Sequence, residues 1–234
     1  AGTMTEQELG ELEACACPGA GSCAGMFTAN SMNCLSEALG IGLPGNGTIP
    51  AVHAARVRLA KAAGLHIIEL VRQNIKPRDV MTMAAFRNAI AVDMAFGGSS
   101  NTALHLPAIA NEGKMKLPLA VFDEISEKVP HICNMSPAGP HHLEDLYMAG
   151  GVYAIMKTLS GAGLIDTSCL TVTGTAVSDV LSGAQVCDQD VIRPLANPYH
   201  AKGGLAVLSG SLAPSGSIVK RIGASESVWH FRGT

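Results

Sequence analysis

The chain has 234 residues, of which 47% are apolar and 15% are charged, so it can bury a substantial core and is not a mainly disordered protein. The net charge is −3 and the Lys and Arg residues form no cluster, which argues against a nucleic-acid partner. No apolar run approaches the roughly 20 residues that cross a bilayer, so we expect no membrane partner.

Helical periodicity dominates the first 190 residues. In chain order, helices are expected over 4–13, 27–39, a long stretch between Pro50 and Pro77, 81–96, 99–110, 123–128 and 143–159. Thr82 is expected to cap the helix over 81–96, and a short strand is expected over 131–135. A Gly-Gly pair at 150–151 predicts close contact between the last of these helices and a neighbouring element.

The pattern changes near residue 190. Short β-like runs then follow, separated by Gly, Pro and Ser, at Leu205–Leu208, Ser217–Lys220 and Val228–Phe231. We therefore predict an α/β fold in two parts. A helix-rich N-terminal domain around a sheet would occupy residues 1–190, and the first strands of a β-barrel-like C-terminal domain, incomplete here, would occupy 191–234.

The chain has seven cysteines, and this odd number in mostly apolar surroundings argues for reduced thiols in a cytoplasmic protein rather than for disulfides. Cys15, Cys17 and Cys23 lie within nine residues. Cys23 follows a Gly-rich turn just before a predicted helix, where the helix dipole favours the thiolate form. Its neighbours are small, which leaves room for a bulky group at the sulfur.

These residues alone leave alternatives open for Cys23. A buried or merely reactive cysteine in a tight turn is as compatible with the spacing as a metal ligand. A zinc site needs paired Cys or His spacings, and an iron–sulfur site typically needs three or four thiolates. The local chemistry therefore suggests one ligand and not a complete site.

A resemblance to a known family bears on this choice. The segment ACPGAGSCAGMFTANSMNCLSEALG over 16–40, followed by LPGNG over 43–47, resembles the signature of dihydroxy-acid dehydratases, whose wider family includes sugar-acid and phosphogluconate dehydratases. Further matching segments occur in the same order: GGSSNT over 97–102 with LHL over 104–106, HLEDL over 142–146 with AGG over 149–151, and KGGLAVL over 202–208 with IVK over 218–220. The resemblance covers essentially the whole chain.

The resemblance implies a hydro-lyase that converts 2,3-dihydroxy-3-methyl carboxylates to 2-oxo acids in valine and isoleucine biosynthesis, acting as a cytoplasmic homodimer. It implies an iron–sulfur cluster, [2Fe–2S] or [4Fe–4S], held by three cysteines. One of them is carried over to Cys23. The other two cysteines, the Mg²⁺ ligands and the serine base belong to segments outside this chain, so we expect an internal piece that is inactive alone.

Two other functions are compatible with the sequence. One is a sugar-acid dehydratase of the same family, and the other is a non-catalytic zinc or redox module built on Cys15, Cys17 and Cys23. For the remaining polar groups the structural interpretation is favoured. We expect structural roles for Cys17, Cys34, Cys133, Cys169 and Cys187, with Cys34 a thiol in the core. The acidic residues at 141–145 are expected to favour a helix start and the turn at 97–101 to cap a helix, and His105 is expected to lie in the core.

Overall fold

The computed structural model describes residues 2–16 and 19–222. Its helices in chain order are α1 (Glu6–Cys15), α2 (Thr28–Ala38), α3 (Ala54–Arg72), α4 (Pro77–Val80), α5 (Met83–Ala95), α6 (Thr102–Glu112), α7 (Ala120–Ser126), α8 (Leu143–Met148), α9 (Gly151–Ser160) and α10 (Val177–Leu181), followed by β1 (Leu205–Gly210) and β2 (Ala213–Lys220). Within these residues, no helix combines the length and apolar character needed to cross a membrane.

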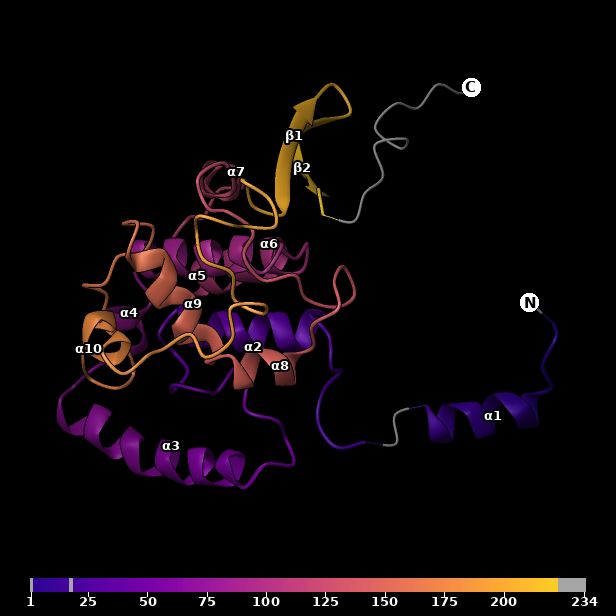
Figure 1. Ribbon diagram of the computed structural model, residues 1–234, viewed down its shortest axis with the longest axis horizontal. Coiled ribbons are helices and arrows are strands. Elements are labelled where there is room, and N and C mark those ends of the chain that lie inside the picture. Colours follow the sequence, from indigo (N-terminus) through magenta and orange to yellow (C-terminus); the bar gives the residue numbers. More distant parts are fainter. Residues whose placement is uncertain (1, 17–18, 223–234) are drawn as a thin grey trace.

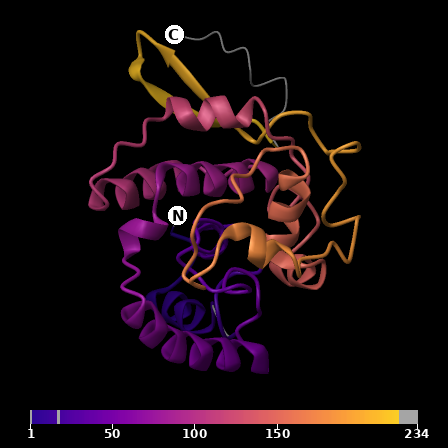
Figure 2. The same cartoon turned by 90° about the vertical axis from the view of Figure 1, so that its left-hand side faces the viewer.

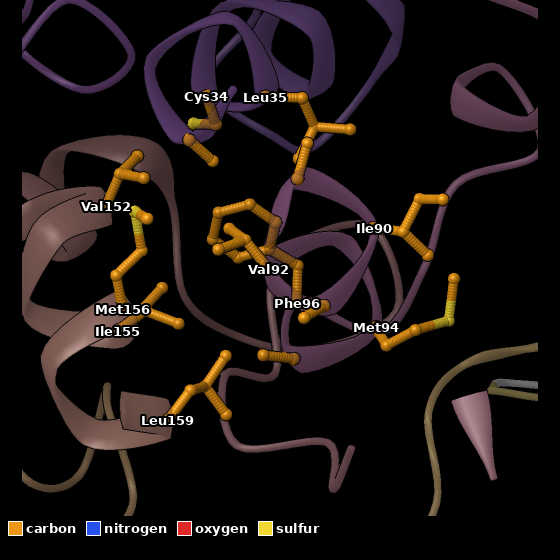
Figure 3. Close-up of a cluster of buried hydrophobic side chains, with 14 of the residues drawn as sticks. Cys34, Leu35, Ile90, Val92, Met94, Phe96, Val152, Ile155, Met156 and Leu159 are labelled. Atoms are coloured by element: carbon orange, nitrogen blue, oxygen red, sulfur yellow. The ribbon is translucent and has the colours of Figure 1, made fainter. Parts of the chain in front are cut away.

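Helix α5 is the centre of the fold (Figure 1). Ten of its 13 residues are buried, because it packs against α2, α6, α7 and α9. Several of its residues are alanines, whose small side chains let neighbouring helices approach closely. Figure 3 shows how Ile90 of α5, Leu35 of α2 and Leu159 of α9 contribute to one apolar cluster. Each large side chain buried in this way contributes about 1.5–3 kcal/mol to stability.

The expected boundaries of α5 are confirmed. Thr82 is its N-cap, and its hydroxyl accepts a hydrogen bond of 3.2 Å from the amide of Ala85. The helix ends before Gly97 and Gly98, which adopt φ values of +102° and +71°. Residues with side chains rarely adopt this left-handed region, so the two glycines stop the helix and turn the chain.

The helix expected over 143–159 is divided into α8 and α9. Gly150 and Gly151 have φ values of +118° and +70°, which a continuous right-handed helix does not permit. The expected close contact is present, because a Cβ atom on Gly150 would lie 2.2 Å from the carbonyl oxygen of Gln185.

The long helix after Pro50 is confirmed as α3, but Pro77 does not close it. The helix ends at Arg72, and Asn74 follows with a φ of +55°. The amides of Asn74 and Ile75 then bond to the carbonyls of Val71 and Leu70 at 3.1 and 2.9 Å, which is the Schellman arrangement. Pro77 instead begins the short helix α4, where its missing N–H has no cost.

Helices α1 and α3 lie at the periphery. Neither has a buried residue, α1 lies apart from the helical body in Figure 1, and α3 runs along its lower edge in Figures 1 and 2. The core is therefore formed by the helices around α5, and these two helices present most of their surface to solvent.

The helix-rich α/β class is confirmed, and the described sheet is the antiparallel β1–β2 hairpin, in which Leu205 pairs with Lys220. The hairpin packs on α7, where the amide of Val207 donates to Asp123 at 2.9 Å. The sheet expected within residues 1–190 is not present among residues 2–16 and 19–190, where α2, α6, α7 and α9 pack on α5 instead and the segment 131–135 forms only isolated bridges. The run Val228–Phe231 lies outside the described residues.

Candidate functional site

Cys23 is exposed and carries a free thiol. It lines a cavity of about 390 Å³ between its own loop at 20–24, the turn at 47–52 and the first residues of α8. The neighbours of Cys23 in its own loop are small: Ala20, Gly21, Ser22 and Ala24 all line the cavity. A Cβ atom on Gly21, for example, would lie 2.6 Å from Cβ of Ala51. The cavity thus has an accessible thiol at its wall and open space beside it.

The Cys23 loop, defined as residues 20–25, is held by the buried side chain of Asn30 on α2. The Asn30 amide donates to the carbonyl oxygens of Cys23 and of Gly25, the latter at 2.7 Å. The hydroxyl of Ser22 donates to the side-chain oxygen Oδ1 of Asn30. Because one fully paired side chain binds three points of the loop, the loop has a fixed position relative to α2.

Two backbone contacts fix the other side of this loop. The amide of Met26 bonds to the carbonyl of Ser136 at 2.6 Å, and the amide of Leu143 bonds to the carbonyl of Ala24 at 2.8 Å. Gly25 has no room for a side chain, since a Cβ atom there would lie 2.9 Å from the carbonyl oxygen of Ser136. Segments distant in sequence therefore close around residues 24–26.

Another part of the cavity lining begins at Gly47, the last residue of the Gly45–Gly47 turn, which is bonded to Glu37 of α2. The amides of Gly45 and Gly47 donate to its two carboxylate oxygens at 2.9 and 2.6 Å. Burial raises the pKa of Glu37 to about 7, while these two hydrogen bonds and the charge of Arg56 act in the opposite direction. Arg56 itself donates to the carbonyls of Asn46 and Ile49.

This donor set fits one ligand of an iron–sulfur cluster and no more. Cys23 offers one accessible thiolate next to open volume, whereas the described residues contain no group of three His, Cys, Asp or Glu residues placed to hold a metal ion. Cys15 is exposed at the end of α1 and does not line the cavity. Cys17 lies outside the described residues. The helix α2 begins at Thr28, five positions after Cys23, and so is not directly adjacent to it.

The remaining cysteines lie away from this cavity. Cys34, Cys133 and Cys169 are buried, and burial raises the pKa of each thiol, that of Cys34 well above its ordinary value. The structural interpretation of these three is therefore supported. Cys187, which was expected to be structural as well, is exposed on the segment after α10, so burial does not support a packing role for it. His105, expected in the core, is half-buried on α6.

The acidic start of α8 acts as expected in capping the helix. Asp145 accepts a hydrogen bond of 2.7 Å from the amide of His142, the residue before the helix. The neighbouring Glu144, which sequence reasoning treated in the same way, lines the Cys23 cavity. It is exposed, and its carboxylate adds a negative charge at the rim of the cavity.

The turn at 97–101 is held by a buried carboxylate that sequence reasoning missed. Asp93, near the end of α5, accepts a hydrogen bond of 2.6 Å from the hydroxyl of Thr102 and a longer one of 3.5 Å from the amide of Ser99. Burial raises the pKa of Asp93 to about 7, and its hydrogen bonds and the charge of Lys220 partly offset this. The turn is thus a helix start stabilised from inside the protein, in agreement with the capping interpretation.

Comparison with known proteins identifies the family of the chain. The family model for the N-terminal region of dihydroxy-acid/6-phosphogluconate dehydratases matches residues 1–180, and the model for the C-terminal region of the same enzymes matches residues 190–234. The chain therefore belongs to the dihydroxy-acid/6-phosphogluconate dehydratase family.

Individual relatives of the chain are named dihydroxy-acid dehydratase. A protein of Moorella thermoacetica named dihydroxy-acid dehydratase is 62% identical over 94% of this chain and 40% of its own length. Proteins with the same name from Halothermothrix orenii and Caldicellulosiruptor saccharolyticus are 59% and 58% identical over the whole chain, which covers 42% of each. The chain thus spans about two fifths of the length of these relatives.

Proposed function

We propose that the chain is the central part of a dihydroxy-acid dehydratase, which removes water from 2,3-dihydroxy-3-methyl carboxylates to give 2-oxo acids for valine and isoleucine biosynthesis. The observation that carries this proposal is the accessible thiol of Cys23 at the wall of a 390 Å³ cavity, within a chain 58–62% identical to proteins of that name. A cytoplasmic homodimer of the full-length protein belongs to the same proposal.

The role proposed for this chain is to provide one cluster ligand and to hold it in place. Cys23 would bind an iron–sulfur cluster as a thiolate, and Asn30 would keep its loop against α2 through the hydrogen bonds described above. When bound, such a cluster supplies an open iron that acts as a Lewis acid toward a departing hydroxyl group. The Mg²⁺ ligands and the base that removes the C2 proton would come from outside residues 1–234.

The two-part division of the chain is also a proposal. Residues 1–190 would belong to the cluster-binding domain and residues 191–234 to the start of a β-barrel-like domain. The change from helices to the β1–β2 hairpin after residue 204 supports this division. Limited proteolysis tests it, since a cut near residue 190 should release two fragments of the expected masses.

The ligand assignment is tested by Cys23→Ser in a protein that extends this chain to the full length of its relatives. After anaerobic reconstitution with iron and sulfide, this variant should lose the visible cluster absorption and the dehydratase activity together. Cys187→Ser is the matched control, because Cys187 is also an exposed free thiol but does not line the cavity. Intact absorption in Cys23→Ser would disprove the assignment.

The same protein separates the competing functions. The full-length protein is assayed with 2,3-dihydroxy-3-methyl acids and with sugar acids. Faster turnover of the sugar acids would favour the sugar-acid dehydratase over the proposed function. Stoichiometric zinc binding with no visible cluster would instead favour a zinc or redox module.

A further inference from the structure

One face of α2 carries three buried polar side chains that all meet loop backbone. Asn30, Cys34 and Glu37 stand at positions i, i+4 and i+7, which lie on the same side of a helix. Each is exposed by 1% or less. The opposite side of the helix holds Leu35 and Leu39 in the apolar core. A buried polar stripe of this kind needs partners, because unpaired polar groups in the interior are costly.

The two ends of the stripe bind two segments that contribute residues to the lining of the Cys23 cavity. Asn30 holds the Cys23 loop, and Glu37 holds the Gly45–Gly47 turn. Between them, the Cys34 thiol contacts the carbonyl oxygen of Gly47 at 3.5 Å. A Cβ atom on Gly47 would lie 2.7 Å from Cα of Cys34, so the turn rests directly on the helix backbone. The distance between the Cys23 loop and the Gly45–Gly47 turn is therefore fixed by the spacing of Asn30 and Glu37, about two turns of α2.

Above about pH 7, where Glu37 is ionised, the turn is also bound by charges of both signs. Glu37 accepts from two of its amides, while the guanidinium of Arg56 donates to the carbonyls of Asn46 and Ile49. Hydrogen bonds to charged groups are stronger than neutral ones, and a carboxylate has two oxygens for two N–H groups. A glutamine at position 37 has only one acceptor oxygen, so its NH₂ group would face one of the glycine amides.

We propose that Glu37 is a positioning residue that, with Asn30 on the same face of α2, sets the width of the cavity beside Cys23. It would act through the Gly45–Gly47 turn and not by touching the bound group. The identity of the bound group, an iron–sulfur cluster, rests on the proposed function. The positioning role rests on the contacts described above, so it can be tested without a cluster.

The first test is Glu37→Gln in the 234-residue chain, with hydrogen exchange measured amide by amide. The amides of Gly45 and Gly47 should exchange about 10- to 100-fold faster than in the unsubstituted chain, while amides in α5 keep their rates. Ser31→Ala is the matched control on α2, because Ser31 is equally buried and its hydroxyl has no partner among the described residues. Unchanged rates at the two glycines, or an equal rise at all amides, would overturn the proposal.

The second test measures the cavity at Cys23 itself. In a background where Cys15, Cys17 and Cys187 are replaced by Ser, Cys23 is the exposed thiol among the described residues. Glu37→Gln should then change the ratio between its alkylation rates with a bulky maleimide and with iodoacetamide at least severalfold. Ser31→Ala should not. An unchanged ratio in Glu37→Gln would contradict a role in setting the cavity width.

These results separate the two proposals. If Glu37→Gln alters exchange and alkylation while Cys23→Ser keeps its cluster in the full-length protein, the positioning role stands and the ligand assignment falls. If Cys23→Ser loses the cluster while Glu37→Gln leaves both measurements unchanged, the ligand assignment stands and the positioning role falls.

Discussion

Replacing Asp93 by Asn should remove a specific pH dependence from the stability of the chain. Asp93 is 1% exposed, and burial raises its pKa from 3.8 to about 7. Its unfolded-state pKa is near the ordinary value, so between about pH 4 and pH 7 the folded state holds a proton that the unfolded state has lost. Stability due to this group is therefore complete below pH 4 and decreases as the pH rises through 7.

The magnitude follows from the difference between the two pKa values. A rise from 3.8 to about 7 corresponds to about 4 kcal/mol, because each pH unit between the two values is equivalent to about 1.4 kcal/mol. The amide of Asn stays neutral at every pH, and its carbonyl oxygen can still accept from the hydroxyl of Thr102. The variant should thus keep the turn at 97–101, and its free energy of unfolding should no longer include the pH-dependent contribution of Asp93.

The measurement is urea denaturation of both proteins at pH 5, 6, 7 and 8. The free energy of unfolding of the unsubstituted chain, minus that of Asp93→Asn, should fall by about 3 kcal/mol across this range, because only the two pH units between pH 5 and the folded-state pKa of about 7 contribute. Taking the difference cancels other titrating groups, including His131, whose pKa burial lowers to about 4 and which acts in the opposite direction. Parallel pH profiles for the two proteins would refute the assignment of a neutral buried Asp93.

Two further predictions concern the packing of β1 and the start of α5. Gly204→Ala should lower the free energy of unfolding by about 3 kcal/mol or more, because its Cβ atom would lie 1.6 Å from the carbonyl oxygen of Gly97, whereas Gly210→Ala, with nothing within 4 Å, should cost little. Equal thermal denaturation midpoints for these two variants would contradict this. Thr82→Ala should cost about 1 kcal/mol through loss of the α5 N-cap, and Thr82→Ser should restore most of it in the same assay.

Several features of the fold could be predicted from the sequence because they depend on neighbours in the chain. Helical periodicity located α2, α5 and α6, and the hydroxyl of Thr82 caps α5 as expected. Cys23 could be singled out by its small neighbours and its place in a Gly-rich loop, and it is accessible in the structure. These signals depend on spacings of a few residues, which the sequence shows directly.

The partners of the buried carboxyl groups could not be predicted in this way. Asp93 stands in a mostly apolar helix and Glu37 in an amphipathic one. Asp93 binds the amide of Ser99 and the hydroxyl of Thr102, and Glu37 binds two amides of the Gly45–Gly47 turn. The one available signal for Glu37 was its i+7 spacing from Asn30, which places two polar residues on one face of α2. The break between α8 and α9 likewise depends on Gly150 meeting the backbone near Gln185.

The sequence by itself determined the positions of the main helices, the change to β structure after residue 200 and the candidate ligand Cys23. Only the tertiary structure decided that α5 takes the central place in the helical region, that α2 holds two segments that contribute to the lining of the Cys23 cavity, and that Glu144 reaches the same cavity. The physical reason is that helices form through contacts three and four residues apart, whereas a cavity forms where separate loops close on one another.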